Sequence, residues 1–258
     1  AYDAYDKIFF SSDAFGRFGA PADPDVDALS PEYEAEEWLP EARRYYIGIV
    51  GKQGDAVLKL YAKAKVLDVN IICPLHGPVL THDLMKYFDV YTKWASYVPE
   101  EKGIAVCYSS VYGHTKDAVM LLVNTLKEIH KGMTHCDRET AEDLKIEVFD
   151  LARDDMSAAV AACFEYDRVV LATTTYYNEI FPCMQDFINH LKHSAFKNRR
   201  VGLIENGTWA PKAAGVMKKM LEDCPGIEYC ENIVTLKSAL SDESRARIAE
   251  LAKELLQA

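Results

Sequence analysis

The segment IAVCYSSVYGHT, residues 104–115, decides the fold of this chain. Its first five residues are apolar and partly β-branched, which is typical of a short strand in the interior of a parallel sheet. Hydroxyl residues and a glycine follow at once, and residues 117–131 continue with the apolar spacing of a helix. The segment therefore predicts a buried strand, a tight polar turn and a helix.

Such a turn aims backbone N–H groups and hydroxyls at one point beside the positive end of a helix, which favours phosphate. The turn lacks the lysine of a Walker A loop and the GxGxxG spacing of a dinucleotide fingerprint. A phosphate monoester remains, and flavin mononucleotide (FMN) is the leading candidate. Taken alone, the turn is equally compatible with an ordinary capped helix start.

Two further segments repeat the pattern of a buried strand with a polar end. They are RVVLATTTYYN, residues 168–178, and RVGLIENGTW, residues 200–209. Open α/β sheets bind ligands at the carboxyl ends of their strands, so hydroxyls, amides and aromatic rings at three such ends predict one site for a planar ring. The predicted cofactor-binding residues are Ser110, Val111, Tyr112, Gly113, His114, Thr115, Thr174, Thr175, Tyr176, Tyr177, Asn178, Asn206, Gly207, Thr208 and Trp209. Phe181, by contrast, is expected to pack rather than bind.

Residues from about 103 to 258 resemble a flavodoxin domain. The match rests on SVYGHT, residues 110–115, which is similar to the hydroxyl-x-x-Gly-x-Thr loop of that family, with His114 in place of the more usual Asn. The resemblance implies a doubly wound parallel sheet of order 2-1-3-4-5. We expect strands near 103–108, 145–150, 167–173, 200–206 and 229–235, and helices near 115–131, 155–163, 180–193, 211–222 and 242–257.

The first hundred residues carry a different pair of strand ends. KIFFSSDAFG, residues 7–16, ends in an acid and a glycine, and NIICPLHGPVL, residues 70–80, ends in a histidine inside a Gly-Pro turn. A helical stretch from about 30 to 66 separates them, and a helix from 81 to 97 follows. Asp13 and His76 are candidate ligands, because carboxylate and imidazole suit iron, manganese or zinc. Without further context, a capped turn and an ordinary histidine explain them more simply.

FSSDAFG, residues 10–16, and LHGP, residues 75–78, closely resemble motifs of flavodiiron proteins. In that family a metallo-β-lactamase-like domain holding two irons precedes a flavodoxin domain. The resemblance implies that Asp13 bridges the irons and that His76 ligates one of them. It divides the chain into residues 1–100, a partial metallo-β-lactamase-like α/β segment, and residues 101–258, an FMN-binding flavodoxin-like domain.

One departure from the family pattern concerns the metal. The His-x-Glu-x-Asp-His ligand cluster of the family, which precedes the Asp motif, occurs nowhere among the seven histidines of this chain. We therefore expect a carboxyl-terminal portion of a flavodiiron protein, with no complete diiron centre unless other residues supply the missing ligands.

Composition sets outer limits on function. A net charge of −11 argues against nucleic-acid binding, which needs a basic surface. The seven cysteines form no CxxC pair, which indicates reduced thiols and a cytoplasmic protein. No apolar run approaches the roughly 20 residues of a membrane helix, so no membrane contact is expected.

The resemblance implies an oxidoreductase that reduces O2 to water or nitric oxide to nitrous oxide. It also implies a head-to-tail homodimer and a redox donor, either rubredoxin-like or an NAD(P)H-linked reductase. Two alternatives remain open: an electron-transfer flavodoxin-type protein whose first segment only dimerises, and a flavin-free scaffold. An NAD(P)H:quinone reductase of flavodoxin fold explains less, since it leaves Asp13 and His76 without a role.

Overall fold

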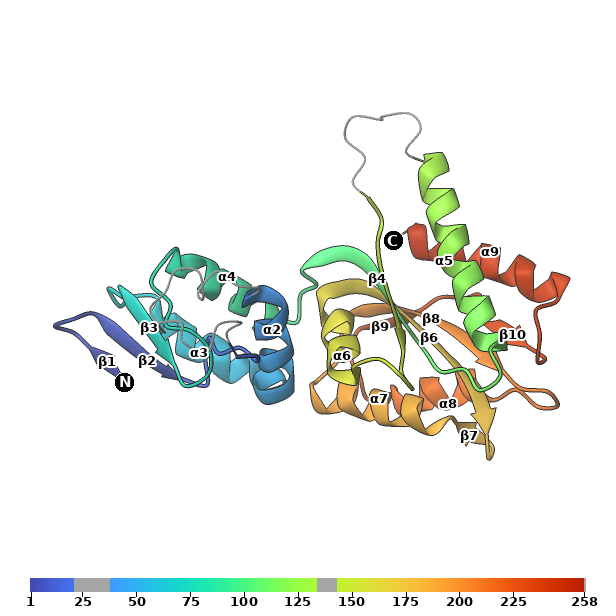
Figure 1. Cartoon of the computed structure of the whole chain (residues 1–258), viewed down its shortest axis with the longest axis horizontal. Helices are drawn as coiled ribbons and strands as arrows, with labels where there is room; N and C mark the ends of the chain where they lie inside the picture. The colour runs from blue at the N-terminus through green and yellow to red at the C-terminus, as the bar shows by residue number, and fades with distance from the viewer. Residues whose placement is uncertain (21–37, 134–142, 258) are drawn as a thin grey trace. The chain divides into compact units, whose positions relative to one another are not determined.

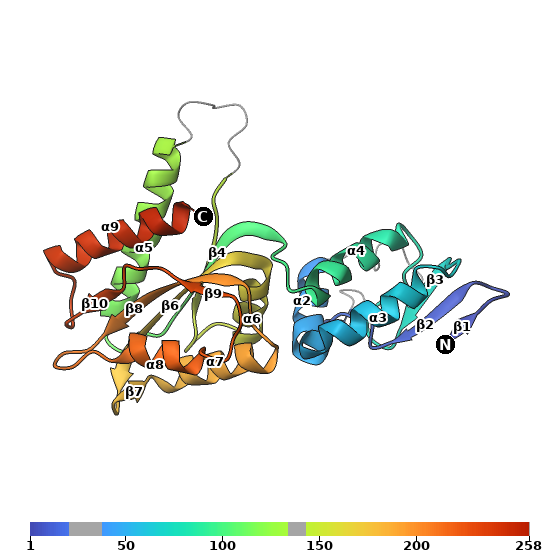
Figure 2. The same cartoon turned by 180° about the vertical axis from the view of Figure 1, so that it is seen from behind.

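A computed structural model describes residues 1–20, 38–133 and 143–257. The chain divides into two compact units, Ala1–Val98 and Pro99–Ala258. Figures 1 and 2 show the elements of each unit.

The second unit is a parallel sheet in the order β5-β4-β6-β8-β10, which is 2-1-3-4-5 when the five main strands are numbered along the chain. Every neighbouring pair in this path is parallel. The predicted flavodoxin-like order is thus confirmed. The strands are β4 (Glu101–Tyr108), β5 (Lys145–Asp150), β6 (Tyr166–Tyr176), β7 (Glu179–Ile180), β8 (Arg199–Asn206), β9 (Ile227–Tyr229) and β10 (Val234–Leu236).

Helices cover both faces of this sheet. In both views α5 and α9 lie together on one face, and α6, α7 and α8 lie on the other. The α5/α9 face buries β-branched side chains of β4 and β6, namely Ile104, Val106 and Val170, at 0% exposure. The helices are α5 (His114–Met133), α6 (Met156–Glu165), α7 (Pro182–His193), α8 (Ala213–Met220) and α9 (Asp242–Leu256).

Two predicted boundaries in this unit are wrong. Residues 180 and 181 do not begin a helix: Ile180 belongs to β7, which forms an antiparallel hairpin with the end of β6, and α7 starts at Pro182. The fifth strand, expected at 229–235, is two short strands, β9 and β10, which pair with opposite ends of β8.

The first unit combines a small mixed sheet with helices. Strand β2 (Ile8–Ser12) lies between β1 (Tyr2–Asp3), antiparallel, and β3 (Ile71–Pro74), parallel. The helices are α2 (Trp38–Tyr45), α3 (Gly54–Ala64) and α4 (Leu84–Ala95), with a π-helical turn Tyr46–Val50 and a 3-10 turn Gly51–Gln53 between α2 and α3. The predicted helical stretch is therefore broken near residues 46–53, and its first part, 30–37, lies outside the described residues.

The core of the first unit is largely aromatic. Phe15 stacks on Tyr61 with ring centroids 5.4 Å apart and meets Tyr91 at 4.7 Å, while Trp38 meets Tyr87 at 4.5 Å. Rings at such separations add to the apolar area that each side chain buries. This aromatic core supports the ends of β2 and β3, which Asp13 and His76 follow.

Candidate functional site

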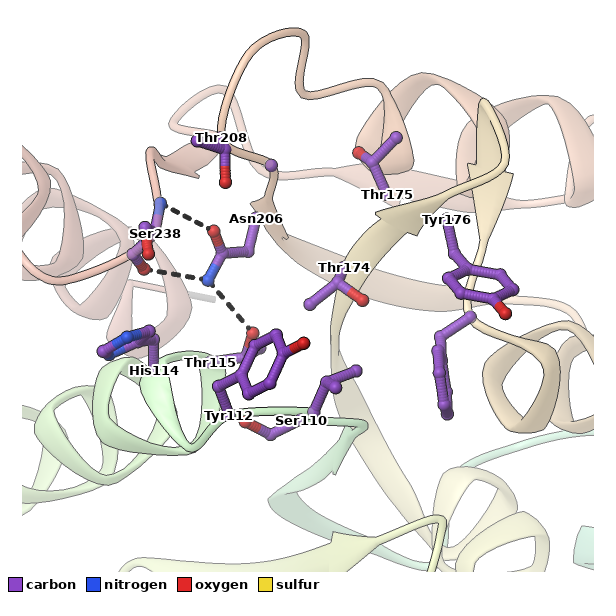
Figure 3. Close-up of a pocket in the computed structure, with 13 residues that line it drawn as sticks. Ser110, Tyr112, His114, Thr115, Thr174, Thr175, Tyr176, Asn206, Thr208 and Ser238 are labelled. Carbon is purple, nitrogen blue, oxygen red and sulfur yellow. Dashed lines mark hydrogen bonds between the residues drawn. The ribbon is translucent and has the colours of Figure 1, made fainter.

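A pocket opens at the carboxyl ends of β4, β6 and β8 in the second unit (Figure 3). The three strand ends meet there because the strands are parallel and adjacent. The strand order switches between β4 and β6, because the connection after β4 leads to β5 on one side and the connection after β6 leads to β8 on the other. Such a switch is the usual ligand position in these sheets. The lining residues are Ser110, Val111, Tyr112, His114, Thr115, Thr174, Thr175, Tyr176, Phe181, Asn206, Gly207, Thr208 and Ser238.

The first wall is the loop between β4 and α5. The hydroxyl oxygen of Ser110 accepts the backbone N–H of Gly113 at 3.1 Å and that of Lys116 at 3.3 Å. Two N–H groups thus converge on a single oxygen atom at the start of a helix. An oxygen of a phosphate group can accept in the same manner, and the helix dipole favours its charge.

A buried hydrogen bond anchors this loop to the sheet. The hydroxyls of Ser109 and Thr173 lie 2.6 Å apart, and the two side chains are almost fully buried, at 1% and 0% exposure. They join the end of β4 to β6 directly below the pocket. The loop is therefore held in place before any ligand arrives.

The second wall is the end of β6. The hydroxyl of Thr175 accepts the backbone N–H groups of Lys212 at 2.9 Å and Ala213 at 3.3 Å, so it caps the start of α8. Tyr176 packs edge-on against Phe181, with ring centroids 5.4 Å apart. These two rings form the aromatic side of the pocket.

The third wall is the end of β8 with the loop after β10. Asn206 is 6% exposed, and its side chain binds Thr115 and the backbone of Ser238, as the dashed lines of Figure 3 show. Gly207 and Thr208 continue this wall. The three walls supply hydroxyl and amide groups on one side and aromatic rings on the other.

The structure places most of the predicted cofactor residues around this pocket, with four outside its lining. Gly113 shapes the loop but does not line the space, while Tyr177 and Asn178 form the turn of the β6–β7 hairpin. Tyr177 is 85% exposed and Trp209 is 95% exposed. Contact of these residues with a ring remains a prediction.

Two lining residues were not predicted. Phe181 was expected only to pack, yet the β6–β7 hairpin brings it back beside Tyr176 at the pocket. An aromatic residue shortly after a polar strand end was the available signal. Ser238 gave no such signal, because its place depends on a bond to Asn206, which is 32 residues earlier in the chain.

The charge of the pocket differs from that of the whole chain. None of the thirteen lining residues carries a carboxylate, although the chain has a net charge of −11. The nearby carboxylate of Glu205 is engaged elsewhere, since it accepts the N–H of Ala214 and the hydroxyl of Thr235, each at 2.9 Å. An anion can therefore enter without facing a buried like charge. These donors and rings fit a phosphate monoester that carries a flat ring system, as FMN does.

A cysteine lies close to the first wall. Cys183 occupies the first turn of α7 and has a side-chain hydrogen bond to Ser109. Burial raises the pKa of this thiol, and the Ser109 hydrogen bond opposes that effect. The thiol is therefore kept protonated at neutral pH and acts as a packing group below the loop.

The predicted metal ligands lie at one edge of the first unit. Asp13 follows β2 and His76 follows β3, and both residues are exposed. Tyr45 contacts both: its hydroxyl donates to Asp13 Oδ1 at 3.4 Å, and its ring centroid lies 5.6 Å from that of His76. Burial, followed by the charge of Asp13, raises the pKa of Tyr45 to about 12.

These residues do not fit a dinuclear iron site. Within residues 1–20, 38–133 and 143–257, no three His, Cys, Asp or Glu side chains gather closely enough to hold a metal ion. One carboxylate and one imidazole are too few ligands for iron. Metal ligation by Asp13 and His76 therefore remains a prediction that requires further donors.

The fold and the pocket define a flavodoxin-like α/β protein with a polar pocket at the switch point of its parallel sheet. Solved structures share the fold of nearly the whole chain. Rubredoxin oxygen:oxidoreductase from Desulfovibrio gigas matches 99% of this chain and 60% of its own, with a TM-score of 0.85 at 17% identity. The flavodiiron protein from Giardia intestinalis gives a TM-score of 0.83 at 20% identity over the same shares.

Curated relatives agree. The coenzyme F420H(2) oxidase of Methanothermobacter marburgensis is 28% identical over 238 residues, which cover 89% of this chain and 54% of the relative. An anaerobic nitric oxide reductase flavorubredoxin of Salmonella typhi is 21% identical over 224 residues, 86% of this chain and 43% of its own length. No family model matches the chain. Sequence and structure neighbours thus identify the flavodiiron proteins as the family that this chain resembles, and the chain spans about half the length of these curated relatives.

Proposed function

We propose that the Pro99–Ala258 unit binds FMN and transfers electrons as part of an oxidoreductase of the flavodiiron type. The observation that carries the proposal is the convergence of three polar strand ends on one pocket free of carboxylates. The hydroxyls of Ser110 and Thr115 at the start of α5 supply the phosphate end, and Tyr176 with Phe181 supplies an apolar side for the ring.

When bound, FMN takes up and releases electrons one or two at a time. The chain's own residues hold and orient it. Ser110 and Thr115 offer hydroxyls to the phosphate, and Gly113 lets the backbone approach it closely. A hydrogen bond with Tyr177 raises the pKa of Tyr176, so the Tyr176 hydroxyl keeps its proton at physiological pH.

For the whole protein we propose reduction of O2 to water or of nitric oxide to nitrous oxide. The names of the relatives, an F420H(2) oxidase and a nitric oxide reductase, support this class of reaction. We further propose a redox donor, either rubredoxin-like or an NAD(P)H-linked reductase, and a head-to-tail homodimer. Asp13 and His76 would contribute to an iron site only where other residues complete the ligand set.

A second function is favoured by the small number of candidate metal ligands in the first unit. Because the described residues gather no set of three ligands, the chain would also serve as an electron-transfer flavodoxin-type protein whose first unit is a non-catalytic dimerisation segment. The iron content of a full-length form that supplies the missing ligands separates the two: bound iron in that form would argue for the oxidoreductase, and flavin without iron in that form would argue for this alternative.

Thr115→Val tests the flavin site. The change keeps the side-chain volume and removes a hydroxyl at the phosphate end, so FMN affinity should fall roughly 10-fold or more, the usual effect of losing a hydrogen bond to a charged group. Quenching of flavin fluorescence in a titration of the full chain gives the affinity. Thr125→Val is the matched control: Thr125 lies on the same helix, and its hydroxyl donates to Leu121 O at 2.8 Å, away from the pocket. Equal affinities for both variants and the unaltered chain would rule out the role of Thr115.

A further inference from the structure

The side-chain amide of Asn206 has a single possible orientation. The backbone N–H of Ser238 donates to Asn206 Oδ1 at 3.0 Å, and a backbone N–H can only donate. The Nδ2 group must therefore face the other way, and it donates to Ser238 O at 3.0 Å and to Thr115 Oγ1 at 3.3 Å. The amide oxygen and the amide nitrogen are therefore both engaged, and together they link Ser238 to Thr115.

Ser238 is held in an unusual backbone conformation by this amide. Its φ is +73°, in the left-handed region that a residue with a side chain seldom adopts. Asn206 binds both the N–H and the carbonyl of Ser238, so the bond pair offsets the conformational cost. The loop after β10 is thereby fixed against the start of α5.

The bond to Thr115 determines what the hydroxyl of Thr115 can do. A hydroxyl that accepts a hydrogen bond from Asn206 still has its own proton to donate. No acceptor for that proton is found in the described part of the chain, and the side chain lines the pocket. The proton is therefore available to an acceptor in the pocket.

We propose that Asn206 is a positioning residue that turns the hydroxyl proton of Thr115 toward the phosphate of the bound cofactor. This inference rests on the proposed FMN site and identifies the phosphate as the group of the cofactor that the site recognises. Asn206 does not itself bind the cofactor, because its amide is occupied by Thr115 and Ser238. The chain should therefore prefer FMN to riboflavin, which has the same ring without the phosphate.

Asn206→Ala in the full chain tests this role. The affinity ratio of FMN to riboflavin, measured by titration of each flavin, should fall roughly 5-fold or more, while riboflavin affinity changes little. In the Thr115→Val background the same change should lower the ratio little further, because Asn206 acts through that hydroxyl. Asn124→Ala is the control, since Asn124 is exposed on α5 and lies outside the pocket lining.

Each other outcome is distinguishable. Equal losses of affinity for FMN and riboflavin in Asn206→Ala would overturn the positioning role without contradicting the proposed FMN site. A full further fall of the affinity ratio in the double variant would do the same. Equal affinity of the unaltered chain for FMN and riboflavin would also overturn the positioning role, because the phosphate would then contribute nothing to binding. No binding of either flavin would remove the proposed function and this role with it. If circular dichroism shows Asn206→Ala unfolded, Asn206→Leu, which keeps a branched side chain and adds no charge to the pocket, is measured in its place with the same expectation.

Discussion

Gly113 shows how a single backbone position shapes the phosphate loop. Its φ is +95°, and an added Cβ there would meet no atom within 4 Å. The conformation, rather than crowding, is what requires glycine at this turn. That conformation allows the N–H of Gly113 to point back at Ser110 Oγ and the chain to enter α5 directly.

Gly113→Ala should destabilise the chain by about 1 kcal/mol, the usual cost of a left-handed residue with a side chain. Gly215→Ala is the comparison: Gly215 lies in helix α8, where an added Cβ also meets nothing within 4 Å, and the change should stabilise the chain by up to about 1 kcal/mol. Urea unfolding followed by circular dichroism measures both. Effects of the same sign would contradict the assigned conformation.

The β6–β7 hairpin is an element that the sequence pattern did not predict. Tyr177 and Asn178 have φ values of +49° and +61°, the pattern of a two-residue type I′ turn. Asparagine is common in such turns, but tyrosine is unfavoured there, and a tyrosine pair followed by Asn did not signal a turn. A strained residue at a pocket rim is consistent with a functional constraint.

Tyr177→Asn should stabilise the hairpin by roughly 0.5 kcal/mol, because asparagine tolerates the left-handed region. If Tyr177 also contacts the ring, as predicted, FMN affinity should fall in the same variant. Tyr177→Phe separates the two effects, since it keeps the ring and the strain. Thermal unfolding and a flavin titration on each variant give the answer, and loss of stability in Tyr177→Asn would count against the turn assignment.

The division of the expected fifth strand into β9 and β10 is a second feature that the sequence did not predict. Tyr229 pairs with Val201 and Val234 with Ile204, so the β9–β10 stretch contains more residues than the part of β8 that it follows. Cys230 still donates its N–H to Val201 O at 2.9 Å, and the strand then leaves the sheet and returns. Apolar periodicity locates such a strand, but an insertion within it depends on the partner strand, which local sequence does not encode.

For the whole molecule, the parallel sheet and the position of the pocket followed from repeated strand–turn–helix patterns, and the strand order followed from the resemblance to flavodoxin. The polar ends of 104–110, 168–176 and 200–208 converge because parallel neighbours must end at one edge. The contributions of Ser238 and Phe181 could not be foreseen, since each depends on a tertiary contact. The described residues include no helix long and apolar enough to cross a bilayer.

The edge of the first unit that carries Asp13 and His76 limits which metals the chain is expected to bind. Asp13 and His76 come from adjacent parallel strands and share Tyr45 as a neighbour, which places them at one edge as the sequence indicated. Two ligands hold iron weakly at best. We expect the chain to carry flavin and to carry little iron.

A visible spectrum of the purified full chain, with iron determined on the same sample, tests the central claim most directly. The expected result is the flavin absorption of one FMN for each chain, with little iron. Absence of flavin bands even after FMN is added would contradict the account. A pair of irons bound to each chain would contradict the expected low iron content and would mean that donors other than Asp13 and His76 complete a metal site.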